Sequence, residues 1–208
     1  MESGRKISRE YENIVDNVLI DISEKLNPFY KEIGITPNIL TTISLVVTIY
    51  GVYIYHKAKC NSIIVYVGVL LYFVGYYFDC ADGNMARRYK MTSKFGDYYD
   101  HISDLCKLII TFYILYKTVP KNKFHYYLKT VMILILLMSI QFGCQELIYG
   151  KKDESPYLNM INLCKFSKDP KSTTKITKYF GAGTVQVAIC IMLLYAKVGN
   201  CKLFKKSR

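Results

Sequence analysis

Four long apolar runs dominate the hydrophobic pattern of this chain. Residues 33–55, which include ILTTISLVVTIYGVYIY, hold no charged side chain, and neither do the runs 61–78, 130–145 and 179–196. A helix needs about 20 apolar residues to cross the hydrocarbon core of a bilayer, so each run is a candidate membrane span. A chain of 208 residues has too little polar sequence to cover four such helices in a soluble core. The pattern therefore predicts an all-α integral membrane protein.

The number of spans depends on two less apolar segments. Asp97–Tyr116 forms a fifth span only if its acids and Lys107 face the inside of the bundle. Ser155–Phe166 is too short and too polar for a sixth, unless the 149–196 region is divided differently. We therefore expect a bundle of five to six transmembrane helices.

The first 36 residues are polar and do not have the pattern of a secretory signal peptide. Within them, apolar residues recur at helical spacing between acids and amides, and these are Ile14, Val15, Val18, Leu19, Ile22 and Leu26. The spacing predicts an amphipathic helix in the membrane interface that ends at Asn27-Pro28. We divide the chain into an N-terminal segment, 1–36, and a transmembrane domain, 37–208.

Charge and cysteine content narrow the class of protein further. The net charge is +12, but half of the residues are hydrophobic, which excludes a disordered polycation. The basic residues lie between apolar runs rather than along one face, and this argues against a nucleic-acid partner. The seven cysteines are odd in number and form no CxxC pair, so we expect free thiols rather than a disulfide framework or a zinc site.

Basic residues also indicate an orientation. With five spans, the N-terminal segment, the 87–94 loop and the 151–178 loop share one side and carry more Lys and Arg than the loops of the other side. The positive-inside bias then places these segments in the cytosol, although the basic tail after Ala196 falls on the opposite side.

Aspartates gather where the second span meets the third helical segment. Asp79 and Asp82 are three residues apart and share one helix face, and Asp100 and Asp104, four apart, share another. A hairpin through the loop 88–95 brings the two faces together, with Asp97 nearby. Carboxylates so close at low dielectric repel one another unless cations neutralise them.

The residue types of this cluster favour particular chemistry. Oxygen ligands suit Mg²⁺ or Mn²⁺ better than zinc, and two such ions between shared carboxylates serve phosphoryl transfer. Arg87 lies at the same mouth, where a guanidinium can hold a phosphate oxygen. Gly83, Ala86 and Gly96 are small enough to let a nucleotide, or simply another helix, approach closely.

At these positions the sequence resembles a known family. The run Asp79-x2-Asp82-Gly83-x2-Ala86-Arg87-x8-Gly96-x3-Asp100-x3-Asp104 is similar in type and spacing to the signature of the class I CDP-alcohol phosphatidyltransferases. A weaker similarity includes Thr36-Pro37-Asn38-Ile39-Leu40-Thr41, before the first span. The resemblance covers roughly residues 10 to 116, with the catalytic motif at 79–104.

The resemblance implies a role for each matching residue. Asp79, Asp82 and Asp100 are expected to bind two divalent ions, Mg²⁺ or Mn²⁺, and Asp104 is expected to contact the same metal site. The positions of Gly83, Ala86 and Arg87 match those that contact the nucleotide and its diphosphate, and Asn38 matches one near the cytidine. The implied reaction transfers a substituted phosphate from a CDP-alcohol to a lipid or polar alcohol, releasing CMP. The family also implies a homodimer within the membrane lipids.

Several alternatives stay open at this point. The catalytic base is Asp104 or His101, which directly follows Asp100 as in choline and ethanolamine phosphotransferases, whereas the short length resembles enzymes that use CDP-diacylglycerol. The donor is therefore CDP-diacylglycerol, CDP-choline or CDP-ethanolamine. Two other classes of protein also fit intramembrane carboxylates, a divalent-cation channel or transporter and an inactive membrane scaffold that retains the motif.

Overall fold

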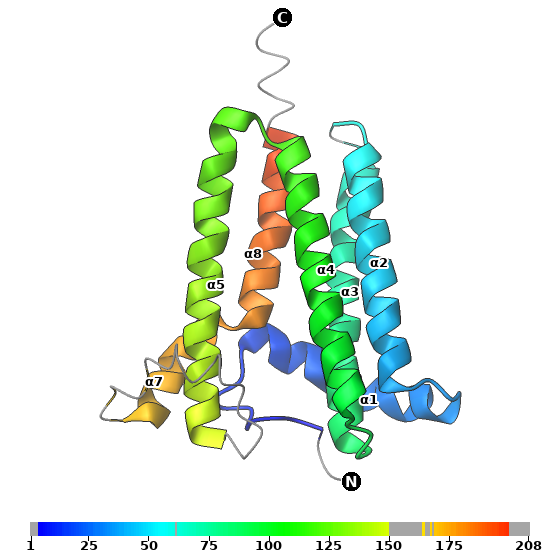
Figure 1. Ribbon diagram of the computed structural model, residues 1–208, viewed down its shortest axis with the longest axis vertical. Helices are drawn as coiled ribbons and strands as arrows, with labels where there is room; N and C mark the ends of the chain where they lie inside the picture. Colours follow the sequence, from blue (N-terminus) through cyan, green and yellow to red (C-terminus); the bar gives the residue numbers. More distant parts are fainter. Residues whose placement is uncertain (1–3, 61, 150–163, 165–166, 168, 200–208) are drawn as a thin grey trace, which may run out of the picture.

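The chain folds into helices joined by short connections (Figure 1). The computed structural model describes residues 4–60, 62–149, 164, 167 and 169–199. The elements are α1 (Ile14–Glu32), α2 (Pro37–Lys57), α3 (Ile63–Arg88), α4 (Lys94–Thr118), α5 (Lys121–Tyr149), α7 (Pro170–Thr177), a 3₁₀ turn (Lys178–Phe180), α8 (Ala182–Leu194) and a π-helical turn (Tyr195–Gly199). The all-α fold predicted from the sequence is confirmed.

The helices α2, α3, α4, α5 and α8 run side by side along the long axis, and α1 and α7 lie at one end of this bundle (Figure 1). Four helical segments within the described residues are long and apolar enough to cross a membrane, and they are Pro37–Lys57, Ile63–Arg88, Lys121–Gln145 and Pro170–Gly199. The helix α4 is too charged to be one of the four, although it lies alongside α2 and α3 (Figure 1). The count of five to six spans stays a prediction, because most of Ser155–Phe166 lies outside the described residues.

Glycines bring α2 and α3 into close contact. A Cβ atom on Gly68 would lie 2.7 Å from the Cβ of Tyr55, and one on Gly51 would lie 2.8 Å from the carbonyl oxygen of Gly68. Neither position therefore accepts a larger residue without separating the helices. This contact fixes the height and rotation of α3, which carries the first two aspartates of the motif.

The N-terminal helix is amphipathic, as predicted, but the face that packs on the bundle is mixed, with Leu19 and Ile20 buried beside polar residues such as Asn27. Asn27 donates through Nδ2 to the carbonyl of Ala81 at 3.2 Å and to Oδ1 of Asn84 at 2.8 Å, so α1 is held against the end of α3. The apolar residues of the opposite face are exposed, and they include Ile14, Val18, Ile22 and Leu26. An exposed apolar face at the end of a membrane bundle is typical of a helix that lies in the interface.

The predicted end of α1 at Asn27-Pro28 is wrong, because the helix continues to Glu32. A proline inside a helix leaves the carbonyl four residues earlier without its usual donor, and for Pro28 that carbonyl belongs to Glu24. Arg88 supplies the missing bond, donating through Nη1 to the Glu24 oxygen at 2.5 Å. The Arg88 side chain at the end of α3 thus allows α1 to continue beyond Pro28.

The prediction of free thiols is wrong for at least three cysteines. Cys144 and Cys164 form a disulfide, with their Cα atoms 5.2 Å apart, and Cys60 is disulfide-bonded as well. Three described cysteines are free, namely Cys80, Cys106 and Cys190. Spacing along the chain gave no sign of these bonds, because Cys144 of α5 and Cys164 meet only in the folded protein.

Candidate functional site

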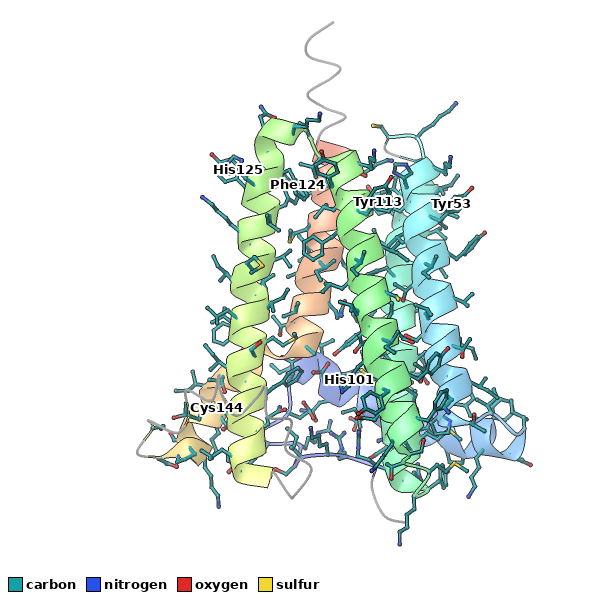
Figure 2. The ribbon with its side chains drawn as sticks, in the orientation of Figure 1. Tyr53, His101, Tyr113, Phe124, His125 and Cys144 are labelled. Atoms are coloured by element: carbon teal, nitrogen blue, oxygen red, sulfur yellow. A yellow bond between two sulfur atoms is a disulfide. The ribbon has the colours of Figure 1, made fainter. Side chains whose placement is uncertain are left out.

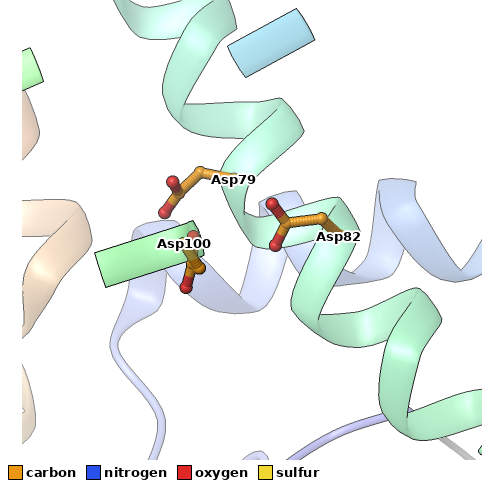
Figure 3. Close-up of side chains that lie close together, drawn as sticks. All are labelled: Asp79, Asp82 and Asp100. Atoms are coloured by element: carbon orange, nitrogen blue, oxygen red, sulfur yellow. The ribbon is translucent and has the colours of Figure 1, made fainter. Parts of the chain in front are cut away.

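Three carboxylates from two helices converge at one end of the bundle. Figure 3 shows Asp79 and Asp82 on α3 pointing toward Asp100 on α4. One oxygen from each lies within 4.8 Å of the others. The helical spacing on α3 and the hairpin into α4 therefore bring together three of the four predicted metal ligands.

The surroundings of these carboxylates fit a bound cation. Thr41 donates to Oδ2 of Asp82 at 2.6 Å, which orients that carboxylate toward the others. The Oδ1 atom of Asp100 is buried and has no hydrogen-bond partner. A buried carboxylate oxygen without a donor is costly, and a hard divalent ion would satisfy it while offsetting the repulsion within the group.

The fourth aspartate, Asp104, contacts a lysine rather than the other three carboxylates. The Nζ atom of Lys107 lies 2.7 Å from Oδ1 of Asp104, pairs with Asp79 on the neighbouring helix, and donates to Oγ of Ser44 at 3.1 Å. Lys107 thus links α2, α3 and α4 around one ammonium group. The sequence placed this lysine inside the bundle but gave it no role in the site.

The predicted substrate-binding residues share one cavity. Asn38, Gly83, Ala86 and Arg87 line a volume of about 170 Å³ at the ends of α2, α3 and α4. Asp82 and Asp100 form its inner wall. The cavity therefore places small residues, an amide and a guanidinium directly beside two of the carboxylates.

Arg87 is held in position by the N-terminal segment. Its Nε atom donates to the carbonyl of Gly4 at 2.8 Å, and its guanidinium lies beside Gly83, where an added Cβ would be 3.1 Å from Nη1. A side chain at position 83 would therefore push the guanidinium out of place. Gly4, which lies far from the motif in the sequence, could not have been associated with Arg87 before folding.

His101 is placed differently from the carboxylates. Its side chain is 71% exposed, and its Nε2 atom lies 3.7 Å from Oδ1 of Asp97, an exposed residue of the first turn of α4. His101 does not line the cavity that holds Arg87 and Asp100. It stays on the surface of α4, in the lower half of the bundle as drawn in Figure 2.

Comparison with protein families explains why these residues occur together. The CDP-alcohol phosphatidyltransferase family model matches residues 34–202, which is most of the chain. The chain belongs to this family. The comparisons with curated proteins and with solved structures each give no significant match.

Membership in the CDP-alcohol phosphatidyltransferases confirms the resemblance seen in the sequence. It identifies the helical bundle as an integral membrane fold and the activity class as transfer from a CDP-alcohol in phospholipid synthesis. The four apolar segments agree with a multi-pass membrane protein. The family is known for divalent-metal use, and the aspartate group of α3 and α4 is the corresponding feature of this phosphatidyltransferase.

Proposed function

We propose that this CDP-alcohol phosphatidyltransferase moves a substituted phosphate from a CDP-alcohol to the hydroxyl of an acceptor and releases CMP. The donor is CDP-diacylglycerol, CDP-choline or CDP-ethanolamine. The observation that supports the proposal most strongly is the meeting of Asp79, Asp82 and Asp100 beside the cavity of Asn38, Gly83 and Arg87. In this arrangement a carboxylate cluster adjoins a cavity suited to a diphosphate.

The cavity supplies the contacts that hold the nucleotide. The guanidinium of Arg87 can pair with diphosphate oxygens, and the absence of side chains at Gly83 and Gly96 lets the diphosphate approach the helix backbones. Asn38 lies in the first turn of α2 and lines this cavity, where its amide can bind a polar edge of the cytosine. These residues bind and orient the leaving group.

The aspartates would hold the metal ions. Asp79, Asp82 and Asp100, with Asp104 as a further ligand, would bind two Mg²⁺ or Mn²⁺ ions. Such ions, when bound, neutralise the diphosphate and stabilise the charge that develops on the departing CMP. Thr41 keeps Asp82 turned toward this position through the bond to Oδ2.

Asp104 is the better placed of the two candidate bases. Its carboxylate is half exposed and lines a second cavity together with Asp79, whereas His101 lines neither cavity. The contact of 2.7 Å with Lys107 fixes the position of this carboxylate. We assign proton removal from the acceptor hydroxyl to Asp104.

The test is CMP release from the purified protein in lipid nanodiscs with Mg²⁺ or Mn²⁺. CDP-diacylglycerol is offered with inositol, serine or glycerol 3-phosphate, and CDP-choline or CDP-ethanolamine is offered with diacylglycerol. We expect metal-dependent CMP from one of these combinations and none from Asp79→Asn. A folded protein that releases no CMP from any combination would contradict the proposal and favour an inactive scaffold.

Two further parts of the proposal concern the whole molecule. The end of α3 that carries Arg87 is assigned to the cytosolic side, in agreement with the positive-inside bias of the loops. A homodimer is expected from the family. Cross-linking in native membranes at low protein density, read as monomer against dimer on a gel, tests the second point.

A further inference from the structure

A second cavity lies on the other side of the carboxylates. It has a volume of about 440 Å³ and is enclosed mainly by α3, α4, α5 and α8. Asp79 and Asp104 are among its lining residues. Most of its wall is apolar, and α5 contributes one continuous face, made of Val131, Ile135, Met138 and Phe142.

Five polar side chains of this cavity are already paired within it, namely Asp79, Asp104, Lys107, Tyr72 and Gln186. Lys107 is the only cation among its lining residues, and it is bound by Asp79 and Asp104. Tyr72 donates its hydroxyl hydrogen to Oε1 of Gln186 at 2.6 Å. A polar acceptor such as a sugar alcohol, an amino acid or a phosphorylated alcohol would therefore lose its hydration here without gaining enough partners.

The two cavities have no lining residue in common. The smaller one contains Asp82, Asp100 and Arg87, whereas the larger one contains Asp79 and Asp104. In phosphoryl transfer the incoming and leaving oxygens lie on opposite sides of the phosphorus. If CMP departs into the smaller cavity, the acceptor must approach from the larger, apolar one.

The larger cavity is also accessible from the side of the bundle. The helices α4 and α5 meet at their connected ends, where the rings of Tyr116 and Phe124 contact edge to face with centroids 5.0 Å apart. Nearer the carboxylates, Leu105 and Leu108 line the cavity and are nevertheless 55% and 36% exposed. These exposed lining residues place the opening of the cavity between α4 and α5.

We propose that the acceptor of this phosphatidyltransferase is a lipid with a free hydroxyl, of the diacylglycerol class, which enters between α4 and α5. The inference rests on the proposed function. The lipid oxygen forms the new bond to phosphorus, its proton passes to Asp104, and the bond from phosphorus to the CMP oxygen breaks with its electron pair leaving on CMP. The donor therefore carries the small alcohol.

Substrate pairs and one matched pair of variants test this assignment. We expect CMP release with CDP-choline or CDP-ethanolamine plus diacylglycerol, and not with CDP-diacylglycerol plus a polar alcohol. Ile135→Trp, which fills the cavity, should raise the KM for diacylglycerol by about tenfold or more and leave the KM for the CDP-alcohol within about twofold. Ile133→Trp, at a 58% exposed position of the same helix, is the control and should change neither value.

A binding measurement separates this inference from the proposed function. Diacylglycerol with a photoreactive acyl chain should label the α5 face of Val131 and Ile135, and both Ile135→Trp and excess unlabelled diacylglycerol should prevent the labelling. CMP release from CDP-diacylglycerol and a polar alcohol would overturn the lipid acceptor while leaving the proposed function intact. Labelling that stays on exposed α5 residues would also overturn it. Competed labelling without CMP release from any pair would uphold the lipid cavity and contradict the proposed reaction.

Discussion

Asp100 is the carboxylate whose surroundings most directly imply a cation, because its buried Oδ1 atom has no hydrogen-bond partner. Asp100→Asn should lower metal-dependent CMP release by at least about 100-fold, since the neutral amide neither binds a hard cation well nor offsets the diphosphate charge. Mn²⁺ binding, followed by electron paramagnetic resonance, should weaken in parallel. Asp169→Asn is the control, because it is exposed at the N-cap of α7, where asparagine serves equally well. Unchanged Mn²⁺ binding by Asp100→Asn would contradict the metal assignment.

Lys107 leads to a different prediction, because its ammonium occupies the space between Asp79 and Asp104. Lys107→Met leaves both carboxylates without that cation. In EDTA the melting temperature, followed by circular dichroism, should fall by roughly 5–15 °C, as expected for one partner of a buried ion pair. Addition of Mg²⁺ should raise the melting temperature of the variant by more than it raises that of the wild type. An equal loss with and without Mg²⁺ would show that Lys107 acts only through packing.

The sequence predicted part of this site, and physical reasons set the limit. Residues three and four apart on a helix share a face, so Asp79 with Asp82 and Asp100 with Asp104 could be paired before folding. Lys107 contacts Asp79 across 28 residues of sequence, and this depends on the rotation of α4 against α3. No periodicity in the sequence encodes that rotation.

At the scale of single elements, α1 is attached to the bundle through a buried carboxyl group. Asp16 accepts a hydrogen bond from the Tyr76 hydroxyl at 2.5 Å and one from the backbone N–H of Gly183 at 3.3 Å. Burial raises the pKa of Asp16 above its ordinary value of 3.8, against the opposing effect of these two donors. Asp16 therefore connects α1 to α3 and α8, and burial at this contact disfavours its ionised form relative to the unfolded chain.

This raised pKa predicts a pH dependence of stability. A carboxyl group whose pKa is higher in the folded state stabilises the fold fully below its unfolded pKa and loses that contribution as the pH rises through the folded pKa. Asp16→Asn resembles the protonated group at every pH. The melting temperature of the variant should therefore rise relative to that of the wild type between pH 4 and pH 8. A difference that stays constant over this range would contradict the assignment.

Element boundaries show what the sequence pattern could and could not indicate. The four apolar runs correspond to the four candidate spans, because a membrane helix is recognisable from composition alone. The course of α1 past Pro28 depends on Arg88, which supplies a donor to the Glu24 carbonyl from another helix. A tertiary contact of this kind overrides the local rule that a proline ends a helix.

For the molecule as a whole, the cysteines provide a test of orientation. The bonded Cys144 lies at the end of the bundle occupied by α7 (Figure 2), and Cys60 lies in the connection of α2 to α3 at the opposite end (Figure 1). Disulfides persist only on the oxidising side of a cellular membrane. The bonded pair Cys144–Cys164 of the structure and the proposed cytosolic site therefore disagree, because a cytosolic location predicts that these two cysteines are reduced to thiols in the living cell, whereas Cys60 stays bonded.

Maleimide–polyethylene glycol added to rapidly lysed cells reads this out as a mass shift. In a variant that keeps only Cys144 and Cys164, both cysteines should react without reductant. Cys60 should react only after reduction. The opposite result would place the carboxylates on the oxidising side and contradict the proposed orientation.

The most direct test of the central claim is metal-dependent CMP release, with wild type and Asp79→Asn compared side by side. Both proteins are stripped with EDTA, confirmed to be folded by circular dichroism, and supplied with donor, acceptor and increasing Mg²⁺. We predict that CMP release by the wild type begins only with Mg²⁺ and saturates, and that Asp79→Asn stays at background at every concentration. CMP release by the wild type in EDTA, or by Asp79→Asn at a normal rate, would contradict a metal-dependent transferase centred on these aspartates.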